Sequence, residues 1–349
     1  MTSLPRVLLA ASAIFNLLLS AQAAYTGSAG CGKALPGALT PGGPSQNLTI
    51  QSQSRIGSNT TRQYIAHLPE GFSATNDKSA PLILAFHGQQ QPAYSMERIT
   101  GLSTSFFNKD SIVIYPEGLN IQDPGQQWLG DPEAPTSSVV DDRIFAEELL
   151  DALTSSLCVD ETRIYVAGLS NGGGLAGLLS CSPTLNKRVA AFAGVAAAYW
   201  LDTSLTEPLF EAGCIPQLAE GKKVPFMELH GLNDTVIAYD GNNAAPANNS
   251  IPVTKWVDSW VERNGCAGTT PVVETLEGGN VTQSSWSCDG AENVTVHRKI
   301  NLFGHGWPST TAQGEPFETL RLGPTTWNAT SLVLDFFSKW QLNETALQR

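Results

Sequence analysis

Short apolar runs and longer periodic segments alternate along the chain. The runs are rich in Val, Ile, Leu and Phe, and several stop at a glycine-bearing loop, a pattern typical of buried strands. The run at 82–86, for example, ends at His87-Gly88. The pattern predicts strands at 63–68, 82–86, 112–115, 164–167, 189–195, 224–229 and 294–302.

Between the runs, apolar residues recur three to four positions apart, as in amphipathic helices. The clearest helix begins at Asp141 or Asp142, since either carboxylate can cap a helix N-terminus. Further helices are expected at 253–262 and 331–340. Strands separated by helices imply right-handed crossovers, so the predicted fold class is α/β, a mostly parallel sheet with helices on both faces. The apolar face of the first helix consists of Ile144, Phe145, Leu149, Leu150 and Leu153.

Composition suits one large globular unit. The chain has 349 residues, of which 42% are hydrophobic and 15% are charged. We expect an N-terminal arm at 24–62, which starts in a Gly-, Pro- and Ser-rich stretch without periodicity, and a single catalytic domain at 63–349. The formal net charge is -12 and no Lys/Arg cluster is present, which argues against a nucleic-acid partner.

The first residues have the pattern of a secretory signal peptide. Arg6 is followed by an apolar stretch at 7–19 and by the small-x-small site Ala21-Gln22-Ala23. Residues 1–23 are therefore expected to be removed and the mature protein to be secreted. The apolar stretch is too short to span a bilayer, and no later segment reaches about 18 consecutive apolar residues, so no membrane contact is expected.

The cysteines and glycosylation sequons agree with an exported protein. All six cysteines lie after residue 23 and none has CxxC spacing, so disulfides are favoured over a metal site. Of the fifteen pairings that six cysteines allow, chain order favours Cys31 with Cys158, Cys181 with Cys214, and Cys266 with Cys288. The sequons begin at Asn47, Asn59, Asn233, Asn248, Asn280, Asn293, Asn328 and Asn343.

The segment 163–180 has the order of strand, tight turn and helix of a nucleophile elbow. Ser170, in Gly-Leu-Ser-Asn-Gly, is the candidate nucleophile, because such a turn lifts the serine hydroxyl above the sheet edge. Gly168 and Gly172 stand where a Cβ would collide with the packed helix. The backbone N–H of Asn171, at the helix N-terminus, is a candidate oxyanion donor.

A serine nucleophile needs a base, and histidine suits that role near neutral pH. Among the five histidines, His305 lies in a glycine-flanked loop just past the last predicted strand, where hydrolases with this chain order place the base. His305 is therefore the candidate base. His297, inside that strand, is the reserve.

The acid of a triad should lie between nucleophile and base, on the loop after a strand. Asp234 follows the predicted strand at 224–229 and is the best-placed carboxylate. Asp202 and Asp240 are rivals. The resulting order of serine, aspartate and histidine matches hydrolases with a nucleophile elbow rather than chymotrypsin or subtilisin.

Other loop residues complete the expected site. Gln89 follows an early strand, where this class places the second oxyanion donor, its backbone N–H. Trp128, Trp200 and Trp307 stand where loops converge over the strand ends. They are candidates for the wall of an aryl-binding pocket, with ordinary loop packing as the alternative.

Five motifs, in chain order, resemble those of secreted fungal feruloyl esterases. This family is similar to the acetylxylan esterases of the same carbohydrate esterase group and, more distantly, to polyhydroxybutyrate depolymerases. The resemblance covers about 63–340 and departs from the family pattern at Gln89-Gln90 and at 123–135. The motifs are Phe86-His87-Gly88, Tyr115-Pro116-Glu117-Gly118, Gly168-Leu169-Ser170-Asn171-Gly172-Gly173, His230-Gly231-x-x-Asp234 and Gly304-His305-Gly306-Trp307-Pro308.

The resemblance implies an α/β-hydrolase fold, the triad Ser170, Asp234 and His305, and no cofactor. It implies a monomeric esterase that releases ferulate or a related hydroxycinnamate from plant cell-wall polysaccharide such as arabinoxylan, or from its oligosaccharides. An acetylxylan esterase or a polyester depolymerase is the alternative among enzymes. A catalytically silent binding protein is less expected, because such proteins usually lack the serine or the histidine, and both are present here.

Overall fold

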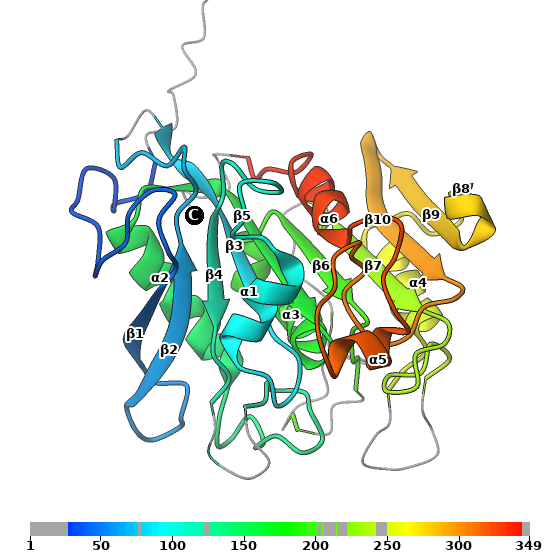
Figure 1. Cartoon of the computed structure of the whole chain (residues 1–349), viewed down its shortest axis with the longest axis horizontal. Helices are drawn as coiled ribbons and strands as arrows, with labels where there is room; N and C mark the ends of the chain where they lie inside the picture. Colours follow the sequence, from blue (N-terminus) through cyan, green and yellow to red (C-terminus); the bar gives the residue numbers. More distant parts are fainter. Residues whose placement is uncertain are drawn as a thin grey trace, which may run out of the picture.

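The computed structural model describes residues 27–75, 78–119, 121, 126–200, 204–205, 214, 222–241 and 250–343. The expected signal peptide, 1–23, lies outside these residues. Within them the chain forms a 10-stranded sheet in the order β1-β2-β4-β3-β5-β6-β7-β10-β9-β8, with helices on both faces (Figure 1). None of the helices in these ranges combines the length and the apolar character that a membrane crossing requires.

The centre of the sheet is parallel. β3 pairs in parallel with β4 and β5, and parallel pairing continues through β6 and β7 to β10. Antiparallel strands flank this centre, β1 and β2 on one side and β9 and β8 on the other, so the expected mostly parallel sheet is confirmed. The strands are β1 Gln46–Ser52, β2 Thr60–His67, β3 Ala80–Phe86, β4 Ile112–Pro116, β5 Val159–Leu169, β6 Ala191–Val195, β7 Phe226–Gly231, β8 Val272–Leu276, β9 Val281–Cys288 and β10 Ala291–Ile300.

Two helix layers cover the sheet. In β3, Leu82 and Leu84 pack in the core that α2, α3 and α4 close, whereas Ile83 and Ala85 pack in the core that α1 and α6 close. Because both faces are buried, this strand reads as a continuous apolar run rather than an alternating one. The helices are α1 Ala93–Thr100, α2 Asp142–Ser156, α3 Asn171–Cys181, α4 Val253–Arg263, α5 Phe317–Arg321 and α6 Ala329–Phe337.

Asp141 is the cap of α2, and Asp142 has a different role. The side chain of Asp141 accepts a hydrogen bond from the backbone N–H of Arg143 at 3.0 Å. Asp142 is the first residue of the helix and forms a buried ion pair with Arg62 at 2.8 Å. The same carboxylate accepts the backbone N–H of Leu129 at 2.8 Å, so it ties the long loop before α2 to the core.

The fold begins earlier than the sequence suggested. β1 lies inside the expected arm, 24–62, and pairs with β2 along its whole length, so the boundary at 63 was wrong. The sequence pattern also missed α1, α5, β8 and β9. The reason is clearest for α5, whose five residues are too few for a helical period, and for β8, whose side chains are mostly exposed and show no buried face.

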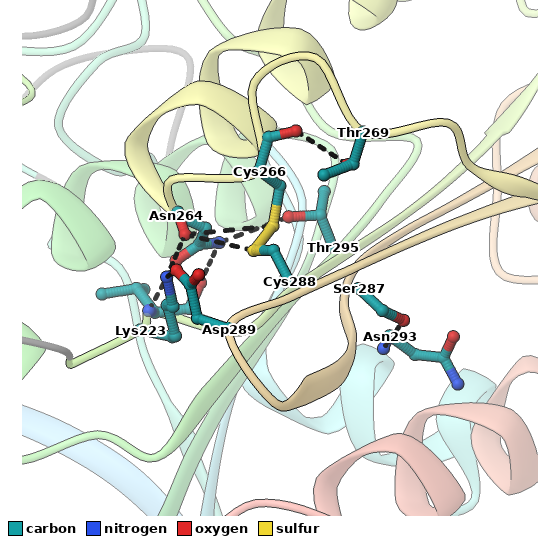
Figure 2. The surroundings of a disulfide bond; sticks show 10 residues. Lys223, Asn264, Cys266, Thr269, Ser287, Cys288, Asp289, Asn293 and Thr295 are labelled. Carbon is teal, nitrogen blue, oxygen red and sulfur yellow. Dashed lines mark hydrogen bonds and ion pairs between the residues drawn. A yellow bond between two sulfur atoms is a disulfide. The ribbon is translucent and has the colours of Figure 1, made fainter.

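Three disulfides join the pairs that chain order favoured, so that prediction is confirmed. One ties the N-terminal segment to the connection between α2 and β5, and one holds the end of α3. The third joins the segment after α4 to the end of β9 (Figure 2). The pairs are Cys31–Cys158, Cys181–Cys214 and Cys266–Cys288.

Candidate active site

Ser170 stands at a sharp turn between β5 and α3. Its φ of 55° and ψ of -120° lie where a residue with a side chain is strained, and such strain persists only where the surroundings enforce it. The Ser170 N–H donates to the carbonyl of Val195 at 3.0 Å. A Cβ on Gly168 would lie 2.1 Å from the carbonyl oxygen of Gly172, and one on Gly172 would lie 2.4 Å from that of His87. Glycine is therefore required on both sides of the serine, as expected.

Asp234 and His305 form a buried pair. Asp234 follows β7, His305 follows β10, and His305 Nδ1 lies 2.8 Å from Asp234 Oδ2. The other carboxylate oxygen accepts the backbone N–H groups of Val236 and Ile237 at 2.9 and 2.8 Å. Burial alone would raise the pKa of Asp234, but hydrogen bonds from neighbouring imidazoles and their charge hold that pKa well below its usual range. The carboxylate therefore stays ionised.

The loop that carries His305 is anchored to α5. The backbone N–H of His305 donates to the carbonyl of Leu320 at 2.7 Å, and that of Gly304 donates to the carbonyl of Arg321 at 3.1 Å. The buried guanidinium of Arg321 returns two hydrogen bonds to loop carbonyls, at 2.9 Å to Ser309 and 3.0 Å to Thr311. The imidazole thus projects from a fixed loop.

Strand register places the elbow and the Asp–His pair at one edge of the sheet. Leu169 of β5 lies opposite Val195 of β6, and Val195 lies opposite Leu229 of β7. Because parallel strands end together, the segments that follow β5, β6, β7 and β10 meet at their carboxyl ends, where α/β sheets bind ligands. Packing connects these segments: Ala198, Trp200 and Ile237 form one buried cluster.

Members of that cluster contact both halves of the candidate site. The backbone N–H of Ala198 donates to the carbonyl of Ser170 at 3.0 Å. The backbone N–H of Ile237 binds the carboxylate of Asp234. Trp200 belongs to the same cluster as Ala198 and Ile237, and 6% of it is exposed. It is the one of the three candidate tryptophans that lies in this cluster and keeps some exposure.

The loop after β3 lies against the elbow. A Cβ on Gly88 would lie 3.3 Å from the Cβ of Ser170. His87 fixes this loop: its Nδ1–H donates to the carbonyl of Gly88 at 2.7 Å, and its Nε2 accepts the N–H of Gly118 at 2.9 Å. Burial lowers the pKa of His87 to about 4, which keeps the imidazole neutral, as the acceptor role of Nε2 requires. Gln89, the candidate oxyanion donor, follows directly.

Trp128 and Trp307 do not line a pocket, so that part of the prediction was wrong. Both side chains are fully buried. The indole N–H of Trp128 donates to the carbonyl of His87 at 2.9 Å, and its backbone binds the Asn171 side chain at 2.8 and 3.2 Å. Trp307 donates to Thr330 at 3.0 Å. A buried indole needs a partner for its N–H, and these rings meet that need while bracing the loops behind the site.

Sequence reasoning missed a buried polar group beneath Asp234. His230 Nδ1 lies 3.2 Å from Glu228 Oε1, and His230 Nε2 lies 2.9 Å from the carbonyl of Ile237 and 3.3 Å from Asp234 Oδ2. The hydroxyl of Tyr199 donates to the other oxygen of Glu228. The sequence held one signal for His230, its place in the His-Gly-x-x-Asp motif, and none for the other two residues.

The alternative base and acids find no support. The ring nitrogens of His297 contact the hydroxyl of Tyr239 at 2.8 Å and the carbonyl of Glu228 at 3.2 Å. Asp240 is exposed, and Asp202 lies outside the described residues.

Among the described residues, no group of three or more His, Cys, Asp or Glu side chains is arranged to hold a metal ion.

Comparison with known proteins gives relatives by sequence. No family model matches the chain. It is 30% identical to feruloyl esterase B of Piromyces equi over 251 residues, which is 70% of this chain and 42% of that protein. It is 24% identical to feruloyl esterase D of Neurospora crassa over 340 residues, 93% of this chain and 95% of that one. The chain is a relative of the feruloyl esterases. It spans 42% to 63% of the length of three curated relatives that it matches.

A solved structure gives the fold of this relative of the feruloyl esterases. The acetyl xylan esterase from Aspergillus awamori matches 75% of the chain with a TM-score of 0.53 and 14% identity, and 94% of that protein is covered. At this identity the likeness concerns the fold alone. Together with the mostly parallel sheet, it identifies an α/β-hydrolase fold, as the sequence motifs implied.

Proposed function

We propose that the protein is a secreted serine esterase in which Ser170, His305 and Asp234 act as nucleophile, base and acid. One observation carries this proposal: a strained elbow serine and a buried Asp–His pair follow β5, β7 and β10, at the carboxyl ends of parallel strands in one sheet. This is the combination that acyl transfer through serine requires. The names of the relatives, feruloyl esterases and an esterase, agree with it.

The proposed reaction has two halves. His305 Nε2 takes the hydroxyl proton of Ser170 while the oxygen attacks the ester carbonyl carbon, and the same proton then goes to the leaving alcohol. Water activated by His305 hydrolyses the acyl-enzyme and restores the serine. Asp234 stays ionised and stabilises the imidazolium that forms in each half. The oxyanion of each tetrahedral intermediate is bound by the backbone N–H groups of Asn171 and Gln89.

The proposed substrate is a hydroxycinnamate ester, such as ferulate, on plant cell-wall polysaccharide. The support is the relation to feruloyl esterases and the position of Trp200 beside the segments that carry Ser170 and Asp234. The three disulfides are typical of an oxidising compartment and, with the signal-peptide pattern of 1–23, support secretion.

Removal of acetate from xylan is the second candidate. Two of the three rings expected to wall an aryl pocket, Trp128 and Trp307, are fully buried, so less aromatic surface faces the site than the sequence suggested. A smaller acyl group would need less of that surface. The alternatives differ in acyl preference and share the same triad.

One pair of assays tests the proposal. Ferulate release from bran arabinoxylan and acetate release from acetylated xylan are measured on one preparation, with Ser170→Ala as the control. We expect ferulate release to dominate and Ser170→Ala to lose at least about 1,000-fold in rate. Dominant acetate release would select the second candidate. Activity within about tenfold of wild type in Ser170→Ala would overturn the triad.

A further inference from the structure

A hollow of about 180 Å³ opens between α4 and the paired strands β9 and β10. The proposed mechanism uses none of its residues. In Figure 1 these strands extend the sheet beyond β7, and α4 lies beside them. The lining consists of Tyr239 after β7, Thr254, Val257 and Asp258 on α4, Thr282, Ser284 and Trp286 on β9, and His297 and Lys299 on β10.

The two walls of the hollow are fixed relative to each other. The Cys266–Cys288 disulfide joins the segment after α4 to the end of β9 (Figure 2). Beside it, the Asn264 side chain binds the backbone N–H and carbonyl of Val224, at 2.8 and 2.9 Å, and so ties the end of α4 to the segment that enters β7. A site with braced walls is largely preformed, so little ordering is needed when a ligand binds.

Polar side chains at the hollow are left without partners from the protein. Among the described residues, neither the carboxylate of Asp258 nor the ammonium group of Lys299 forms an ion pair or a hydrogen bond. The same holds for the hydroxyls of Thr282 and Ser284. Lining groups that bond elsewhere in the protein would have little capacity for a ligand, whereas these donors and acceptors are available to one.

The chemistry of the lining points to a neutral, hydroxyl-rich ring. A carboxylate accepts and an ammonium group donates, so Asp258 and Lys299 together suit hydroxyl groups, which do both. Their charges are opposite, so the pair gives no net preference for an ion of either sign. The half-buried ring of Trp286 offers an apolar surface against which a sugar face can pack. The volume, well below the range of about 300–1,000 Å³ for drug-sized ligands, suits a single ring.

We propose that this hollow binds one neutral sugar unit of a polysaccharide, with Asp258 and Lys299 hydrogen-bonding its hydroxyls. It would act as a subsite of the same enzyme, and its role there rests on the proposed action on cell-wall polysaccharide. Its position supports this role: the ring of Tyr239 lies 6.0 Å from that of His230, which contacts Asp234. A polysaccharide held at the hollow is therefore anchored on the Asp234 side of the candidate active site.

Binding is tested apart from catalysis. The Ser170→Ala protein is titrated with arabinoxylan oligosaccharides that carry no ferulate, and the Kd is measured by calorimetry. Asp258→Ala should weaken binding about tenfold, the effect of losing a hydrogen bond to a charged group. Glu262→Ala removes another exposed carboxylate from α4 and is the matched control, which should leave the Kd unchanged. Absence of binding at millimolar oligosaccharide, or equal binding by all variants, overturns the proposal.

A second experiment fills the hollow in the active enzyme. Ser284→Leu should reduce ferulate release from polymeric arabinoxylan at least about fivefold while kcat/KM for methyl ferulate stays within a factor of about two. Gln283→Leu, the adjacent β9 position whose side chain bonds Arg298 at 2.7 Å, is the control and should change neither rate. Equal losses on both substrates overturn the proposal. If the wild type hydrolyses no ester, the proposed function fails, and the titration still decides whether the hollow binds sugar.

Discussion

His230 Nε2 lies 3.3 Å from Asp234 Oδ2, the carboxylate oxygen that His305 Nδ1 approaches at 2.8 Å. Glu228 Oε1 lies 3.2 Å from the other ring nitrogen of His230. With an acceptor at each nitrogen, the imidazole donates from both and carries a positive charge. Burial alone would lower the pKa of His230, but the hydrogen bonds that it donates to the two carboxylates, together with their negative charge, raise it to about 10. A buried cation therefore stabilises the ionised form of the candidate catalytic acid.

This contact predicts that His230 positions Asp234. His230→Gln keeps an amide donor but loses the charge, and we expect kcat to fall about tenfold with little change in KM, the usual size of one lost charge-assisted hydrogen bond. His230→Leu removes both donors, leaves buried Glu228 with the Tyr199 hydroxyl but without its cationic partner, and should lower kcat and the melting temperature further. Steady-state kinetics on methyl ferulate distinguish the variants. A kcat for His230→Gln equal to that of wild type, with a lower melting temperature, would assign His230 a structural role only.

The same histidine predicts how stability depends on pH. Its pKa is about 10 in the folded protein and about 6.5 in an unfolded chain, so the native state binds the extra proton between these values. Its contribution to the free energy of unfolding is complete below about pH 6.5 and is lost as pH rises toward 10. The melting temperature of wild type should therefore fall more steeply than that of His230→Gln between pH 7 and 9.5. Parallel curves for the two proteins would contradict the raised pKa.

The elbow could be predicted from the sequence because its constraints are local. Gly168, Ser170 and Gly172 fall within five residues. A Cβ on Gly168 would collide inside the turn, and one on Gly172 would collide with the loop after β3. The contact between Asp234 and His305 joins residues 71 positions apart. It could be anticipated from chain order, because parallel strands end at one edge, although its geometry could not.

Side-chain direction was the part that the sequence did not determine. Trp128 stands in a loop over the strand ends, as expected, but its indole N–H binds the carbonyl of His87 and its ring is buried against Phe86 and Phe145. Glu228 is a polar residue within a strand, and only packing shows it to be a buried partner of His230. These assignments depend on contacts across the sheet that no local pattern encodes.

Removal of the Cys266–Cys288 disulfide is expected to lower the free energy of unfolding. The bond closes a loop with a sequence separation of 22, for which the chain-entropy model gives about 3 kcal/mol. The double variant Cys266→Ser/Cys288→Ser should lose about that much free energy of unfolding in urea and keep most of its activity on methyl ferulate, because the bond lies away from Ser170. Activity lost in proportion to stability would show instead that the β9 segment supports the catalytic residues directly.

The position of Trp200 beside the candidate active site predicts a preference for aromatic acyl groups over acetyl groups. A flat aromatic acyl group gains from apolar burial, about 1.5 to 3 kcal/mol for a ring or one to two powers of ten in specificity, whereas acetate offers one methyl group. We expect kcat/KM for methyl ferulate to exceed that for methyl acetate at least about tenfold, and Trp200→Ala to remove most of that ratio.

Trp327→Ala is the matched control for Trp200→Ala. This half-buried ring packs under Arg298, 5.1 Å from the guanidinium carbon, outside the cluster that contains Trp200. Both assays use methyl esters, because an activated phenol leaving group would hide differences in acyl binding. A ratio unchanged in Trp200→Ala would show that a different surface binds the acyl group, and a wild-type ratio near one would favour the acetylxylan esterase alternative.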